Sequence, residues 1–444
     1  MNRTILSLST VAQRAFRTLH RLAYWVGVAT ASVACALLVL FFVARAAIRP
    51  APGAWATTVQ VGPATVDIGV ASLIWLGTTP WVAQQLDGHT LSSPAGPLRI
   101  GWEAKARRLS LRCQPCSLHN ASWGSVPLRL PAVDVTVRRS GMQLQGTVAS
   151  GAVTATWHGQ LSHTSLLLDM DLPDTPVRDG YALFADAIPE LATAQIDGSF
   201  ALRATLSLPS RTLTVEPRLV GMAVLGLGTD QWANAQSTCS RGLPPRAQKV
   251  ALGANSLLAR AVIAAEDQRF FEHTGYDMVE VVHALRSNNQ RAAQAMQATA
   301  DAQQGAASVR GASTLSQQVA KLLVTGGERS PVRKLRELLY AVEMEQTLGK
   351  ARILRLYLDN APWGATVCGA QAAAHTYFAK RADQLTTDEA VWLAAMLHNP
   401  ALEARRWAES GHINEARAQW VASGMRLAAG TRAAGGARLG RLKG

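Results

Sequence analysis

Residues 266–275 read EDQRFFEHTG, and this stretch directly follows an apolar segment with helical spacing. Apolar side chains recur at three and four positions between Leu257 and Ala265, so they share one face of a predicted helix. That face leads into Glu266, where the apolar pattern gives way to acidic, basic and aromatic residues. The pattern therefore predicts a buried helix that carries Glu266 at its end.

Helical patterns continue on the carboxyl side of this stretch. Thr314 with Gln317, and Thr386 with Glu389, have the spacing of capping boxes that open helices. Pro331 follows Ser330 and suits the first position of another helix. We expect an all-α domain over residues 251–402, followed by a C-terminal helix and a basic tail over 403–444. Residues 290–309 are rich in Ala and Gln, which could form a helix by propensity. They have little apolar periodicity, so we favour a mobile or solvated insert.

Residues 57–229 have a different pattern. Apolar and polar side chains alternate in segments such as Val133–Val137 and Phe200–Leu206, as in strands with one buried face. Turn residues separate these segments, which predicts an antiparallel sheet that is sandwich-like or strongly curved. Residues 230–250 contain Gly242, Pro244 and Pro245 and suit a linker. No catalytic constellation is visible in the β-rich region.

Residues 22–44 carry no charge and are nearly all apolar or small. About 20 such residues span a bilayer as a helix. Four arginines and no acid precede the segment, which predicts that residues 1–21 stay in the cytoplasm. The apolar run is longer than a signal peptide needs, so we favour an uncleaved anchor. The fold class predicted is thus α+β and multi-domain: a transmembrane helix, a β-rich extracytoplasmic domain and an all-α domain.

The net charge of +14 is strongly basic. A basic excess suits anionic lipid headgroups, a pyrophosphate or nucleic acid. No recognition helix, zinc-finger spacing or basic-aromatic ladder accompanies the charge, so we expect no nucleic-acid partner. Cys113 and Cys116 could form a local disulfide, a redox pair or half of a metal site. We favour a structural disulfide or free thiols over a redox function.

Five short motifs follow one another in the predicted α domain. They occupy residues 266–275 (EDQRFFEHTG), 311–321 (GASTLSQQVAK), 333–337 (RKLRE), 350–360 (KARILRLYLDN) and 364–380 (GATVCGAQAAAHTYFAK). Arg333 and Glu337 are four residues apart and share a helix face. Two carboxylates among cations suit transfer from a phosphorylated donor, with one carboxylate as base and the cations binding the phosphate. Ion pairs on a helix surface would give the same spacing.

In order and wording, these motifs resemble those of glycosyltransferase family 51, the peptidoglycan transglycosylases. The resemblance covers about residues 252–401 and implies an α-helical, lysozyme-like fold with an apolar lobe partly sunk in the membrane. It implies that Glu266 is the catalytic base and Glu337 the second essential carboxylate. It also implies that the following residues support or contact the substrate: Asp267, Phe270, His273, Thr314, Gln318, Lys321, Arg333 and Lys334.

The same resemblance implies lipid II and the growing glycan strand as substrates. Polymerisation would proceed by inverting transfer, with polyprenyl pyrophosphate as the leaving group. Glu337 is a candidate ligand for Mg²⁺ or Mn²⁺. We expect a single-pass protein of the bacterial inner membrane with its catalytic domain in the periplasm. Other cell-wall synthesis proteins are candidate partners of the β-rich domain.

The chain departs from the family pattern at Leu322, Asp359, Cys368 and Ala379. These positions leave room for a weakly active enzyme or a non-catalytic envelope scaffold on the same fold. A lysozyme-like hydrolase of glycan strands is a further alternative. The cations of the third motif argue against it, because cleavage of a neutral glycosidic bond needs no pyrophosphate clamp.

Overall fold

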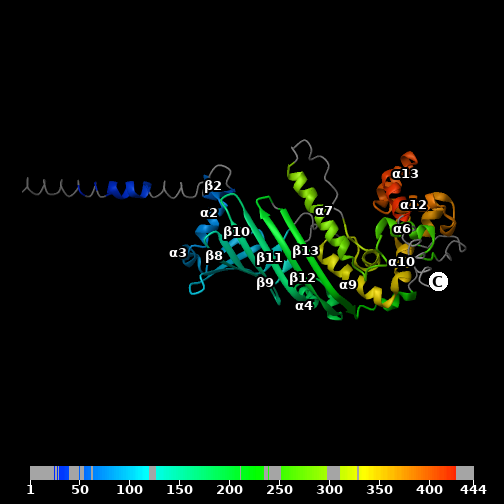
Figure 1. Ribbon diagram of the computed structural model, residues 1–444, viewed down its shortest axis with the longest axis horizontal. Helices are drawn as coiled ribbons and strands as arrows, with labels where there is room; N and C mark the ends of the chain where they lie inside the picture. The colour runs from blue at the N-terminus through cyan, green and yellow to red at the C-terminus, as the bar shows by residue number, and fades with distance from the viewer. Residues whose placement is uncertain are drawn as a thin grey trace, which may run out of the picture.

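The structure is a computed structural model. It describes residues 25, 28, 30–39, 50, 55–61, 64–119, 127–210, 212–234, 239, 252–297, 311–327 and 330–426. The molecule is elongated, with a large sheet in its middle and a group of helices at its C-terminal end (Figure 1). The predicted change from a β-rich region to a helical region is therefore confirmed.

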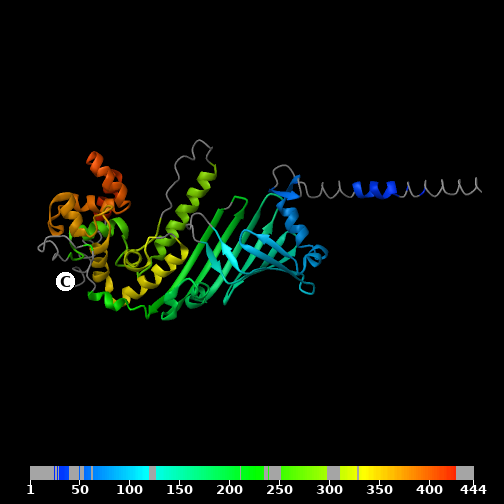
Figure 2. The same cartoon turned by 180° about the vertical axis from the view of Figure 1, so that it is seen from behind.

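The main sheet is antiparallel and has nine strands in the order β13-β12-β11-β10-β9-β8-β5-β4-β3. Figures 1 and 2 show that it is strongly curved and does not close into a sandwich. Its strands are β3 (Thr90–Ser93), β4 (Gly96–Glu103), β5 (Arg108–Cys113), β8 (Val133–Ser140), β9 (Gln143–Ser150), β10 (Val153–Leu161), β11 (Leu166–Pro176), β12 (Gln195–Leu208) and β13 (Thr212–Leu225).

Alternation along each strand gives the sheet one polar and one apolar face. In β10, Trp157 and Leu161 are buried while His158 between them is exposed. Two short helices, α2 (Val70–Gly77) and α3 (Pro80–Leu86), pack on the apolar face near the N-terminal end of the region. The strands β1 (Ala56–Val61) and β2 (Ala64–Gly69) precede them and form a separate two-stranded sheet.

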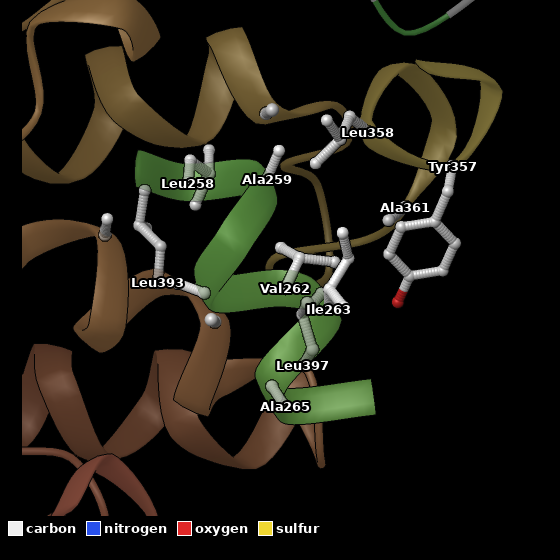
Figure 3. Packing of buried hydrophobic residues seen from close by; sticks show 14 of the residues in the cluster. Leu258, Ala259, Val262, Ile263, Ala265, Tyr357, Leu358, Ala361, Leu393 and Leu397 are labelled. Atoms are coloured by element: carbon white, nitrogen blue, oxygen red, sulfur yellow. The ribbon is translucent and has the colours of Figure 1, made fainter. Parts of the chain in front are cut away.

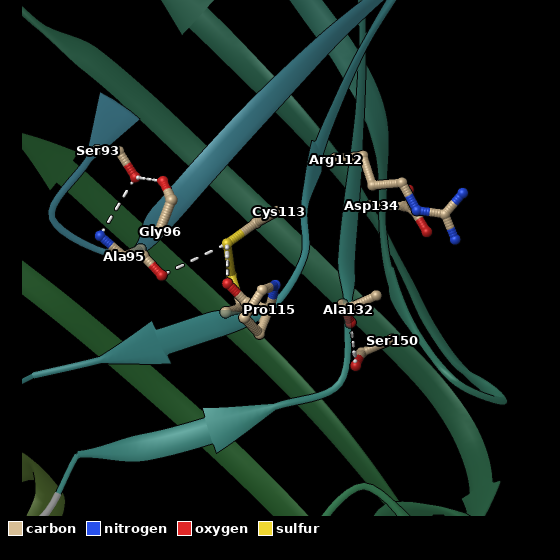
Figure 4. Close-up of a disulfide and its surroundings, with 10 residues drawn as sticks. Ser93, Ala95, Gly96, Arg112, Cys113, Pro115, Ala132, Asp134 and Ser150 are labelled. Carbon is tan, nitrogen blue, oxygen red and sulfur yellow. Dashed lines mark hydrogen bonds and ion pairs between the residues drawn. A yellow bond between two sulfur atoms is a disulfide. The ribbon is translucent and has the colours of Figure 1, made fainter. Parts of the chain in front are cut away.

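A disulfide joins Cys113 and Cys116 where β5 ends and the small strand pair β6 (Cys116–Leu118) and β7 (Leu128–Leu130) begins. Figure 4 shows this bridge beside the turn that contains Ala95 and Gly96. Both cysteines are buried. Of the alternatives that the sequence left open, a local disulfide is therefore the one observed.

The helical region contains α6 (Leu257–Glu266), α7 (Met278–Gln297), α8 (Leu315–Ala320), α9 (Pro331–Thr347), α10 (Gly349–Asn360), α11 (Ala370–Phe378), α12 (Thr387–Met396) and α13 (Pro400–Ser410). Its core surrounds α6: Figure 3 shows Leu258 and Val262 among the side chains of Leu358 and Leu393. Burying the apolar face of α6 in this way fixes the position of Glu266 at its carboxyl end.

Two boundaries differ from those expected. Residues 290–297 continue α7, whose helix packs against β13, so the first part of the predicted insert is helical. The good helix propensity of Ala and Gln, combined with this packing, explains the difference. The remainder of the insert lies outside the described residues. A further helix over 415–426 adds Val421 and Met425 to the core, so that core extends past residue 402.

Of the predicted membrane anchor, the structure describes only residues 25, 28 and 30–39, and these are helical. Within the described ranges, no helix has both the length and the hydropathy that crossing a membrane requires. The remainder of residues 1–44 and the basic tail from 427 onwards fall outside those ranges.

Candidate active site

Glu266 is the last residue of α6, and the Ser256 hydroxyl caps the other end of that helix. The Gln318 side-chain amide on α8 donates a hydrogen bond to Glu266 Oε2 at 3.1 Å. The Tyr357 hydroxyl on α10 in turn donates to Gln318 Oε1 at 3.2 Å, which fixes the orientation of the amide. Glu266 Oε1 is buried and accepts no hydrogen bond from the described residues. Gln318 therefore fixes one oxygen of Glu266, while the lone pairs of the other oxygen accept no hydrogen bond from the described residues.

Burial raises the pKa of Glu266 above its ordinary value. The Gln318 hydrogen bond and the positive charge of Arg417 act in the opposite direction, and the negative charge of Asp267 adds to the rise. A carboxylate with a raised pKa is a stronger base than an exposed one, which suits it to take a proton from a hydroxyl.

Arg417 is a site residue that the sequence analysis missed. Its guanidinium lies 3.6 Å from Glu266 Oε1 and donates to the Ala265 carbonyl at 2.7 Å. It also lies over the Trp420 ring, 4.2 Å from the centroid. Residue 417 is in the C-terminal helix, about 150 positions along the chain from Glu266, and it belongs to none of the five motifs. The only local signal was an arginine within an otherwise amphipathic helix, which is common.

Four of the predicted site residues lie beneath the surface of the site. Asp267 Oδ2 accepts from His273 Nε2 and from the Leu315 amide, both at 2.9 Å. The Thr314 hydroxyl donates to the Gly275 carbonyl at 2.7 Å, and a capping box with Gln317 opens α8.

Phe270 is fully buried, and Asp267, His273 and Thr314 are nearly so. Asp267, His273 and Thr314 tie the loop after α6 to the start of α8. Direct contact of these four residues with substrate stays a prediction.

A second polar cluster lies on α9. Glu337 is fully buried, and its two oxygens accept from Arg333 Nη1 and from Lys334 Nζ, the latter at 2.6 Å. Lys334 Nζ also donates to the Ser313 hydroxyl at 2.7 Å. Burial lowers the pKa of Lys334, as do the charges of Arg333 and Lys321, while Glu337 acts against this. The charges of Arg333 and Lys321 therefore both disfavour the charged form of Lys334.

Helix α8 connects the two clusters. Gln318 on α8 contacts Glu266, and Lys321 at its C-terminus adds its charge to that of Lys334. Ser313, just before α8, contacts Lys334. The structure thus places the base candidate and the cations of the third motif around one short helix. Such a set can deprotonate a hydroxyl at one end and bind an anion at the other.

Glu337 does not form a resident metal site by itself. Both of its oxygens are occupied by cationic donors, whereas Mg²⁺ and Mn²⁺ require several free oxygen ligands. No group of three or more metal-ligating side chains occurs within the described ranges. The divalent ion expected from the sequence stays a prediction, and no chemical step below depends on it.

The departures from the family pattern lie outside these two clusters. Leu322 packs against the helical core, and Cys368 forms a disulfide with Cys239. Ala379 ends α11 in the left-handed conformation that a glycine adopts more readily, with φ 50°. Burial raises the pKa of Asp359, which lies 3.6 Å from Arg355. None of them is a hydrogen-bond or ion-pair partner of Glu266 or Glu337 in the bonds described above.

The site thus combines a buried carboxylate with a cation cluster in an all-helical region. Residues 248–426 match the sequence model of the transglycosylase family. The match includes Arg417 and begins after the β-rich region.

Proteins with the name biosynthetic peptidoglycan transglycosylase are similar to this chain. That of Aeromonas hydrophila is 46% identical over 143 residues, or 32% of this chain and 54% of that protein. That of Thiobacillus denitrificans is 39% identical over 153 residues (34% and 58%), and that of Stutzerimonas stutzeri 41% over 177 residues (39% and 65%). The chain thus spans less than two thirds of the length of each of these relatives.

Proposed function

We propose that this chain is a peptidoglycan glycosyltransferase that polymerises lipid II into glycan strands. The proposal rests on the position of two groups on either side of α8. One is Glu266, whose buried Oε1 accepts no hydrogen bond from the described residues, and the other is the cation cluster of α9. The Glu266 carboxylate would take the proton from the 4-hydroxyl of the acceptor sugar. That hydroxyl oxygen forms the new bond to C1 of the donor while the bond from C1 to the pyrophosphate oxygen breaks, with inversion.

Arg333, Lys334 and Lys321 would stabilise the negative charge that develops on the departing polyprenyl pyrophosphate. Glu337 holds two of these cations in place, and this is the role we give to the second carboxylate. Hydrolysis of a glycan strand would need no such cluster, which is why transfer is favoured over the lysozyme-like alternative.

A lipid-linked substrate requires a site near a membrane. We therefore extend the proposal to a single-pass protein of the bacterial inner membrane, with catalysis on the periplasmic side. The uncharged segment of residues 22–44 supports this. The two disulfides support an oxidising compartment.

The test is polymerisation of lipid II by the detergent-solubilised full chain, with the products separated on a gel. We expect Glu266→Gln to lower the rate by about 10²-fold or more, because the amide cannot accept the proton. Glu272→Gln is a matched control in the same motif, since Glu272 is exposed and pairs only with Arg269 among the described ion pairs.

Three other outcomes would end the proposal. Free reducing ends without polymer would indicate the hydrolase. No product from lipid II, together with unchanged cellular function of Glu266→Gln, would indicate the scaffold. Equal loss of activity in both variants would show that Glu266 has no special role.

A further inference from the structure

The β-rich region lies outside the transglycosylase match, yet it packs directly on the helix that carries the cation cluster. Helix α9 spans Pro331–Thr347 and contacts β13. Arg333, Lys334 and Glu337 lie on one side of it. At 100° per residue, Leu335, Leu339 and Val342 lie on the opposite side.

That opposite side is buried in a core shared by both regions. Leu339 and Val342 of α9 form one buried cluster with side chains from the sheet and its short helices: Val177, Tyr181, Ile188, Met222 and Val224. Because the same apolar contacts complete both regions, α9 belongs to the β-rich region as much as to the helical one.

Polar contacts also attach α9 to the β-rich region and to the segment that follows it. Glu190, in the 3₁₀ helix η2 (Pro189–Ala192), accepts from Arg336 Nε with both oxygens at 2.9 Å and from Nη2 at 2.6 Å. The Tyr181 hydroxyl donates to the Leu335 carbonyl at 3.0 Å. Near the other end, Glu343 accepts from the Leu227 amide at 2.8 Å.

The Glu190–Arg336 pair is well suited to hold a helix in one rotation. The planar guanidinium of Arg336 donates to both carboxylate oxygens of Glu190. This bidentate geometry restricts the direction of the Arg336 side chain as well as its distance from Glu190. Burial alone would raise the pKa of Glu190, but the hydrogen bonds and charge of Arg336, with a hydrogen bond from Tyr340, hold it below its ordinary value. Glu190 is nearly buried, so water screens the pair little.

We propose that the β-rich region is a structural part of the active centre, with Glu190 as a positioning residue. Through Arg336, Glu190 fixes the rotation of α9 and thereby the directions of Arg333, Lys334 and Glu337. The expected effect on catalysis rests on the proposed function. The physical coupling between Glu190 and α9 does not depend on it.

The kinetic test uses the full chain and lipid II. We expect Glu190→Gln to raise KM for lipid II by about tenfold, because misdirected cations bind the pyrophosphate less well. A merely structural role would lower the amount of active enzyme and hence kcat, and leave KM unchanged. Glu190→Arg combined with Arg336→Glu restores the pair and should bring KM back toward the parent value.

Two further variants keep the test decisive. Tyr181→Phe removes a single hydroxyl on the same interface without changing its apolar packing, so it should fold and raise KM in the same direction. Asp174→Asn breaks the exposed pair with Arg218 elsewhere in the sheet and should change nothing.

Hydrogen–deuterium exchange over residues 331–347 separates the two proposals. We expect faster exchange in Glu190→Gln than in the parent and in Asp174→Asn, whether or not the protein polymerises lipid II. Faster exchange with no polymer from the parent would overturn the proposed function alone. Unchanged exchange, or unchanged KM in both Glu190→Gln and Tyr181→Phe, would overturn the coupling.

Discussion

At the scale of single residues, the surroundings of Glu266 differ between its two oxygens. Gln318 holds Oε2, while Oε1 is buried, lies near the Arg417 guanidinium and accepts no hydrogen bond from the part of the chain that the structure describes. The charge of Arg417 favours the carboxylate, and burial disfavours it. The protonation of the base is therefore set by a balance that one substitution can change.

Arg417→Ala tests this balance through the pH profile of kcat/KM. Activity requires ionised Glu266, so it is lost as pH falls through the pKa of that residue. Removal of the cation raises this pKa further, and we expect the acidic limb to move to higher pH. Arg417→Lys keeps the charge and should move the limb less, while Arg426→Ala on the same helix should not move it. An unmoved limb in Arg417→Ala would show that the two groups do not interact.

At the scale of elements, the loop after α6 approaches α9 very closely. Gly275 has φ +100°, and a Cβ at this position would lie 2.8 Å from the backbone carbonyl of Ala341. The carbonyl of Gly275 accepts from Thr314, so the loop, α8 and α9 meet at one point. The site thus depends on a glycine at residue 275 for the distance between its elements.

Gly275→Ala should destabilise the protein by about 2–3 kcal/mol, because strained backbone and a steric contact add together. Gly349→Ala is the matched control: Gly349 also has positive φ, +70°, but a Cβ added there would meet no atom within 4 Å. We expect about 1 kcal/mol for the control. Chemical denaturation measures both, and equal effects would show that the contact with Ala341 contributes nothing.

At the scale of the whole molecule, the segment between the sheet and the helices is attached to the helices at several points. Trp232 stacks on Tyr340 with centroids 5.7 Å apart, and its carbonyl accepts from Arg352. Cys239 forms a disulfide with Cys368, at a sequence separation of 129. The residues predicted as a linker therefore include points fixed to the helical region.

Replacing both Cys239 and Cys368 with Ser should lower stability by about 2–4 kcal/mol, since the bridge closes a long loop in the unfolded chain. Replacing Cys113 and Cys116, which are three residues apart, should cost clearly less. Thermal unfolding of the two double variants measures the difference. A smaller loss from the long-range bridge than from the short one would contradict this view of the linker.

The sequence by itself determined the features that local patterns encode. Helical spacing and capping residues predicted α6, α8, α9 and α12, and alternation predicted the sheet, because period and caps depend on neighbours in the chain. The motifs predicted Glu266, Gln318, Arg333, Lys334 and Glu337 as site residues, and the structure places all of them around α8.

Only the tertiary structure decided what depends on distant parts of the chain. Arg417 reaches Glu266 from 151 positions away, and Glu190 reaches Arg336 from 146 positions away. The packing of α7 along β13 also joins segments that are far apart in the chain. Such contacts leave no periodic signal near either partner, because their energy comes from burial and charge that exist only after the chain has folded.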